Sequence, residues 1–149
     1  MKPRILSIIT GLLTGFLLIS SGEYLTGKLF PLPKGINFSN KAELIAAANK
    51  MPATAFLLLL AIYGFASFAV GLTTTLVLKR ASVANNDMES RNEKALSTSW
   101  RPAIICSLVF TLGGIINATA LNHPLWFVLA NVPVYVLPSY LGYILMNRK

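Results

Sequence analysis

The 149-residue sequence is 54% hydrophobic and only 12% charged, with a mean hydropathy of +0.63. Soluble domains carry about 25% charged residues, so this composition excludes an ordinary soluble domain. The net charge of +8 does not indicate a nucleic-acid-binding protein. The basic residues mostly flank apolar segments and form no run with interleaved aromatic residues. The sequence therefore predicts an integral membrane protein.

The first apolar segment, 5–25, is preceded by basic residues. It is long enough to cross a bilayer, which takes about 20 residues in a helix. The basic start and the small residues at 20–22 are also features of a cleaved signal peptide. The apolar character continues through Leu25, however, and this favours a permanent membrane helix.

The segment 26–51 is polar and is expected to connect two membrane helices. The prolines of Phe30-Pro-Leu-Pro33 prevent a regular helix there, because proline lacks an amide donor and restricts the residue before it. Asn40, followed three residues later by Glu43, resembles a capping box and predicts a short helix over 41–50. The apolar residues of that helix, which we expect on the membrane surface, are Leu44, Ile45 and Ala48.

Three further segments are apolar enough to span a membrane: 52–78, 102–121 and 125–146. The first begins with a proline, which the first turn of a helix tolerates. The polar residues 79–101 form a predicted loop before the second segment, whereas only 122–124 separate the second from the third. The last two segments are therefore predicted to form a tight antiparallel helical hairpin.

The distribution of lysine and arginine predicts which side of the membrane each loop faces. The N-terminus, the 79–101 loop and the C-terminus together contain nine of these residues, whereas 26–51 contains four and 122–124 contains none. We therefore expect a single all-α domain, 1–149, with four transmembrane helices in an antiparallel bundle. Both termini and the 79–101 loop are predicted to be cytoplasmic, and 26–51 extracytoplasmic.

Small residues recur on two of the predicted helices. Ser7, Gly11 and Gly15 lie four residues apart and share one helix face, and Gly64 and Gly71 share a face of the second helix. Small residues at such spacing allow membrane helices to approach closely. We therefore expect the lipid bilayer to be the main partner, with copies of the chain joined through these glycine faces.

Cys106 is the only cysteine, so the chain has no intrachain disulfide, no Cys-x-x-Cys pair and no cysteine-rich metal site. One histidine and one nearby glutamate do not supply the three or four ligands that a protein metal site requires. We therefore expect neither a metal nor a cofactor.

Polar residues gather at one depth of the predicted bundle. At about 1.5 Å per helical residue, Glu23 lies about 27 Å above Ile5, near the boundary of a hydrocarbon core about 30 Å thick. His123 lies at the same boundary, and Asn117 and Asn131 lie roughly one or two turns beneath it. Polar groups at this depth are costly unless paired, and they often mark functional sites. The candidate ligand-binding residues are Glu23, Asn117, Asn122, His123, Asn131 and Trp126.

Purely structural roles are open for several of these residues. Asn117 and Asn131 can form a hydrogen bond across the hairpin. His123 followed by Pro124 can be a helix end and its turn. A kink at Pro133, by contrast, would open a pocket at the level of the asparagines.

A chemical role is open for Glu23 and His123, the two candidate catalytic residues. A carboxylate beside an imidazole orients it and raises its pKa, which would create a proton acceptor near the outer face. The catalytic set is incomplete, however, and no serine lies in a nucleophile-elbow pattern. We therefore favour a non-enzymatic protein that binds a small amphiphile or a partner helix in an outer-leaflet pocket. The alternatives are a small membrane enzyme or proton-coupled transporter, and a structural subunit of a larger complex contacted through 26–51.

Several short motifs are distributed along the chain: Gly22-Glu23, Phe30-Pro-Leu-Pro33, Met51-Pro52, the glycine-bounded 64–71, and His123-Pro-Leu-Trp-Phe127. With these motifs the chain resembles a group of small bacterial four-helix membrane proteins that have no assigned activity. The resemblance spans nearly the whole chain. It implies the four-helix architecture and a location in the bacterial plasma membrane, and it implies no catalytic residue.

Overall fold

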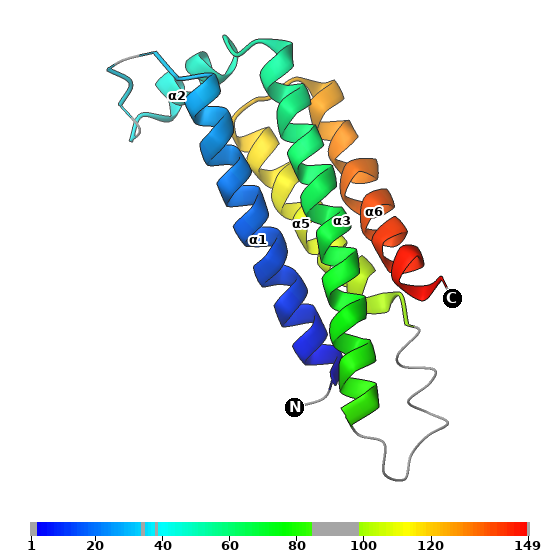
Figure 1. Ribbon diagram of the computed structural model, residues 1–149. Coiled ribbons are helices and arrows are strands. Elements are labelled where there is room, and N and C mark those ends of the chain that lie inside the picture. Colours follow the sequence, from blue (N-terminus) through cyan, green and yellow to red (C-terminus); the bar gives the residue numbers. More distant parts are fainter. Residues whose placement is uncertain (1–2, 34, 38, 85–98, 149) are drawn as a thin grey trace.

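The computed structural model describes residues 3–33, 35–37, 39–84 and 99–148, and the elements within these ranges are helices. Four of the helices are long and apolar enough to cross a membrane, as the composition predicts. A fifth, shorter helix lies between the first two of them (Figure 1). The helices are α1 (Pro3–Leu29), α2 (Lys41–Ala48), α3 (Ala53–Ala84), α5 (Arg101–Ala120) and α6 (Leu125–Asn147).

Two helices extend beyond their predicted ends. Helix α1 continues past Leu25 for a further turn, and α3 continues through Lys79 and Arg80 to Ala84. Lysine and arginine are good helix formers, so a basic pair marks a membrane boundary better than it marks the end of a helix. The predicted loop 79–101 falls largely on 85–98, which lies outside the described residues.

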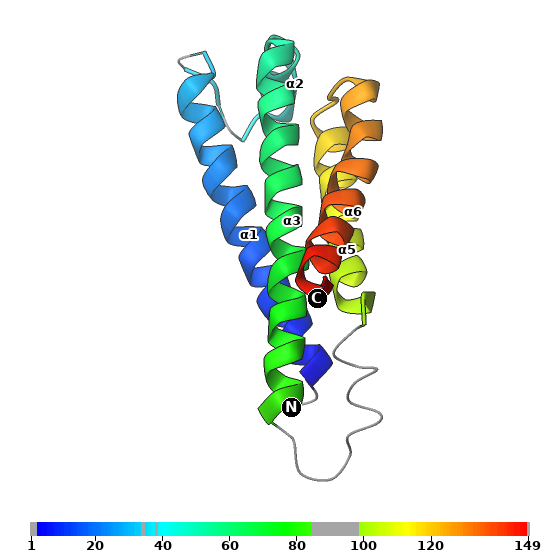
Figure 2. The same ribbon diagram turned by 45° about the vertical axis from the view of Figure 1, so that its right-hand side comes forward.

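Helix α3 packs against the other three long helices and makes the most extensive contacts of the bundle, with α6 and α1. The ends marked N and C lie at one end of the molecule, whereas α2 and the α5–α6 turn lie at the other (Figure 1). Seen after rotation, α1 diverges from α5 and α6 toward the α2 end (Figure 2). The two ends of the molecule therefore differ in how closely the helices approach.

Glycines set the closest approaches between helices. A Cβ atom added at Gly71 would overlap the carbonyl oxygen of Ser139, and one added at Gly142 would overlap that of Phe68, so the α3 and α6 backbones are nearly in contact. Gly11 of α1 is buried against Thr74 of α3. Without a side chain, glycine lets backbones meet, which favours helix association in lipid.

The glycines that were expected to join two copies of the chain lie against helices of the same chain. A Cβ atom at Gly15 would overlap Phe110 of α5, and one at Gly64 would lie 3.8 Å from Val134 of α6. Gly11 and Gly71 likewise face helices of the same chain. Within this fold, all four glycines pack the helices of one chain together.

Buried hydroxyl groups connect the same helices. The hydroxyl of Ser7 on α1 donates a hydrogen bond to the carbonyl of Thr74 on α3 at 2.8 Å. Ser139 on α6 donates to the carbonyl of Ala103 on α5 at 3.1 Å, and Ser67 on α3 donates to the carbonyl of Tyr135 on α6. Each such bond between membrane helices contributes about 0.6 kcal/mol.

Aromatic side chains fill the bundle toward the α2 end. Phe56 and Phe127 are buried with ring centroids 5.1 Å apart, and Tyr63 stacks on Tyr135 at 5.4 Å. These large rings form one hydrophobic cluster that also includes Leu59. They hold the helices further apart than the glycines do at the opposite end.

Helix α2 begins as the capping pattern predicts. The Asn40 side chain accepts a hydrogen bond from the backbone N–H of Ala42 at 3.1 Å and donates one to Glu43 at 2.8 Å. The other Glu43 oxygen accepts from the backbone N–H of Asn37 at 2.9 Å. The prediction of a surface position for its apolar face was wrong for Ala48, which is buried.

Candidate functional site

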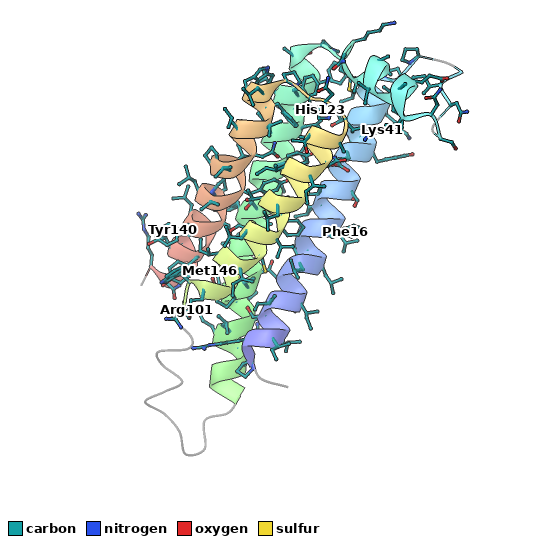
Figure 3. The ribbon with its side chains drawn as sticks, turned by 180° about the vertical axis from the view of Figure 1, so that it is seen from behind. Phe16, Lys41, Arg101, His123, Tyr140 and Met146 are labelled. Atoms are coloured by element: carbon teal, nitrogen blue, oxygen red, sulfur yellow. The ribbon has the colours of Figure 1, made fainter. Side chains whose placement is uncertain are left out.

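A cavity of about 340 Å³ lies at the end of the bundle beside α2; we call it the α2-end cavity. Its walls come from α1, α2, α3, α5 and the segments that follow α1 and α5. Figure 3 shows His123 and Lys41 of α2 at this end of the molecule and Arg101 at the opposite end. The polar lining residues are Glu23, Thr26, Tyr63, Asn117 and His123, and the larger apolar ones are Phe30, Leu32, Leu44, Met51, Leu59 and Leu121.

Three of the predicted site residues therefore line one cavity, namely Glu23, Asn117 and His123. They come from α1, from α5 and from the turn after α5, so residues far apart in the sequence meet there. Helix α6 contributes no lining residue among those described. The α2-end cavity is formed by other helices, so it is not the pocket that a kink at Pro133 of α6 was expected to open.

Glu23 is fixed by a residue that sequence reasoning missed. The hydroxyl of Tyr63 on α3 donates a hydrogen bond of 2.8 Å to one carboxylate oxygen of Glu23. Tyr63 is itself held by its stacking on Tyr135. Nothing in the sequence marked Tyr63, because a tyrosine within an apolar helix is ordinary. Its hydroxyl nevertheless sets the orientation of the carboxylate at the cavity wall.

His123 has different surroundings from those expected. Its ring packs edge-on against Phe56 at 5.0 Å and Phe127 at 5.4 Å, and its Nδ1 atom is buried without a hydrogen-bond partner. Burial lowers the pKa of His123, because the buried ring loses the hydration that stabilises its charged form. The expected rise in this pKa was therefore wrong. The carboxylate that was to cause it, Glu23, is bonded to Tyr63 instead.

The two asparagines do not form the expected hydrogen bond across the hairpin. Asn131 is fully buried, and its side-chain amide donates to the carbonyl of Phe127 in its own helix at 2.7 Å. Its side-chain oxygen has no partner and lies beside Gly114 of α5. Asn117 is exposed and lines the cavity. Equal depth was predicted for this pair, but depth does not fix the direction in which each side chain points around its helix axis.

Asn122 and Trp126 lie outside the cavity lining. Asn122 is exposed with φ 55°, a left-handed conformation that asparagine tolerates better than most residues. The next backbone N–H, of His123, donates to the carbonyl of Ala118 at 2.9 Å and so ends α5. Trp126 is exposed and its ring contacts Phe56 and Phe127 from the edge. The structure thus places Asn122 in a turn and Trp126 at the rim of the aromatic cluster.

A second cavity of about 290 Å³ adjoins the first. It lies between the proline segment 29–33 and the residues that follow α2. The two cavities share Phe30, Leu32 and Met51 as walls. Lys50 lines the second cavity and is not among the lining residues of the first. The two neighbouring cavities therefore carry side chains of opposite charge.

Over the described ranges, no group of three or more histidine, cysteine, aspartate or glutamate side chains is placed to hold a metal ion. No family model, curated protein or solved structure matches this chain.

Proposed function

We propose that this chain is a multipass plasma-membrane protein that binds a small amphiphile in the α2-end cavity. In this proposal the four long helices form an antiparallel bundle across the bilayer, with both termini cytoplasmic. The excess of lysine and arginine at the N-terminus, in 79–101 and at the C-terminus supports that orientation. The cavity then opens within the outer leaflet.

The composition of the cavity wall carries the proposal. Small-molecule sites are typically hollows of about 300–1,000 Å³ with apolar walls and a few convergent polar groups. The α2-end cavity has a volume of about 340 Å³, and most of its lining side chains are apolar. Glu23, Tyr63 and Asn117 offer hydrogen bonds to a polar headgroup, whereas Leu59 and Leu121 offer contacts to a short chain.

Gly27 provides a way to fill the cavity without disturbing the helices. It lines the cavity, and a Cβ atom added there meets no heavy atom within 4 Å. Gly113 of α5 is equally open to a Cβ atom but is not a lining residue. The variants Gly27→Phe and Gly113→Phe therefore add the same side chain inside and outside the cavity.

The test is photocrosslinking with a dodecanol that carries a diazirine on its chain, using purified protein in phosphatidylcholine nanodiscs. Labelled peptides are located by mass spectrometry. We expect labelling of cavity residues in the natural protein, a loss of most of it in Gly27→Phe, and no change in Gly113→Phe. Equal labelling of cavity residues in all three proteins would refute the proposed function.

A further inference from the structure

We infer that the α2-end cavity selects amphiphiles with a cationic, hydrogen-bond-donating headgroup, of which a primary alkylammonium is the simplest example. This inference rests on the proposed function, because it assumes that an amphiphile enters the cavity. It follows from the charge and the hydrogen-bonding capacity of the lining residues.

The charge of the lining is negative although the chain as a whole is basic. The net charge of the protein is +8, yet Glu23 is the one lining residue among those described that belongs to the aspartate, glutamate, lysine and arginine class. Lys50 lines the second cavity and is not among the lining residues of the first. A cationic headgroup would neutralise Glu23, whereas an anionic one would meet it without a compensating lysine or arginine.

The hydrogen-bonding capacity points in the same direction. A carboxylate has two acceptor oxygens with about four lone-pair positions. Tyr63 uses one position on one oxygen of Glu23, and no described residue bonds to the other oxygen, which is open to a ligand. The hydroxyl proton of Tyr63 is committed to Glu23, which leaves lone pairs on the Tyr63 oxygen. Glu23 and Tyr63 therefore offer hydrogen-bond acceptors to a ligand. An ammonium group matches them, because it has three donors and no acceptor.

The aromatic packing of His123 removes the competing basic group. The His123 ring packs against Phe56 and Phe127, and its Nδ1 atom is buried without a hydrogen-bond partner. A proton added to Nδ1 would therefore have no acceptor. His123 thus serves as a neutral wall of the cavity rather than as a cation beside Glu23. The carboxylate is left for the ligand to neutralise.

The experiment compares three photoreactive probes that share one diazirine-bearing dodecyl chain and differ only in the headgroup: amine, alcohol or carboxylate. The protein is held in phosphatidylcholine nanodiscs at neutral pH, so that the lipid adds no net charge. The variants are Glu23→Gln and Glu43→Gln. Glu43 caps α2 at the same end of the molecule and does not line the cavity, so its variant makes the same charge change elsewhere.

We expect the amine probe to label cavity residues about tenfold or more above the alcohol, since the ammonium adds an ionic attraction to Glu23 that a neutral hydroxyl lacks. Glu23→Gln should reduce amine labelling to the level of the alcohol, while Glu43→Gln retains the preference. The glutamine keeps an oxygen acceptor for Tyr63, so the fold of this variant should persist. Glu23→Asp, which keeps the charge, should retain most of the preference and provides a second test.

The two ideas fail in different ways. If amine and alcohol label the cavity equally, and Gly27→Phe removes both signals, the cavity binds amphiphiles but the inferred charge selection is wrong. Stronger labelling by the carboxylate, or an amine preference that survives Glu23→Gln, would also overturn it. If all three probes label the cavity of Gly27→Phe as strongly as that of the natural protein, the proposed function itself is refuted.

Discussion

The two ends of this helical bundle are built from different side chains. Near the chain ends, Gly71 and Gly142 bring the α3 and α6 backbones into contact, and Gly11 packs against the side chain of Thr74. Hydroxyl groups of residues such as Ser7 bond across the interfaces. Near α2, the rings of Phe56 and Tyr63 separate the helices, and the α2-end cavity lies beside them. Small residues thus allow close packing at one end, and large rings pack at the end where the cavity lies.

The largest loss of stability should come from a substitution that forces α3 and α6 apart. Gly71→Ala places a methyl group on the carbonyl oxygen of Ser139, and relief requires the α3 and α6 backbones to move apart. We expect a loss of about 3 kcal/mol in the free energy of unfolding, measured by denaturation in detergent.

Gly64→Ala is the matched control for Gly71→Ala, because Gly64 lies seven residues earlier on the same helix. Its Cβ atom would be 3.8 Å from Val134, an ordinary contact. This variant should be neutral or gain up to about 1 kcal/mol, since alanine favours helix more than glycine does. Equal effects of the two substitutions would contradict the close α3–α6 contact at Gly71.

A smaller effect is expected at the cavity end from Tyr63→Phe. This variant removes the hydroxyl that bonds to Glu23 but preserves the ring that stacks on Tyr135. We expect a loss of about 1 kcal/mol, the usual net value of one hydrogen bond. Tyr24→Phe, on the exposed face of α1, is the control and should leave stability unchanged. Similar melting temperatures for both variants would show that the Tyr63–Glu23 bond contributes nothing to stability.

The smallest effect concerns the charge of His123. Because burial lowers its pKa in the folded protein, the unfolded chain takes up a proton on this side chain at higher pH than the folded chain does. The free energy of unfolding should therefore fall as pH decreases below about 6.5, the ordinary histidine value. NMR titration of the ring protons should give a pKa below that value, and His123→Gln should remove the corresponding part of the pH dependence. A pKa above about 6.5 would contradict the aromatic enclosure of the ring.

Hydropathy was sufficient to predict the four long helices, because length and apolar composition determine what a bilayer accepts. The capping residues Asn40 and Glu43 were sufficient for α2, since helix starts depend on local hydrogen bonds. Glu23 and His123 were expected near each other from depth alone, and both do line one cavity.

What the sequence lacked was the rotation of each helix about its axis. Asn131 and Asn117 were paired by depth, but one points into the core and the other toward the cavity. Tyr63 was not recognised for the same reason, because its partner Glu23 lies 40 residues away on another helix. Such rotations follow from side-chain packing between helices, and that packing is not visible in the pattern of one segment.

The short connection between α5 and α6 also constrains how the protein enters a membrane. Only residues 121–124 join Ala120 to Leu125. Even fully extended, so few residues reach about 14 Å, less than half the thickness of the hydrocarbon core. If both helices cross the bilayer, α6 cannot stay on the starting side once α5 spans it, so the two must insert together. Helices α1 and α3, joined by the longer segment that contains α2, are free to insert one after the other.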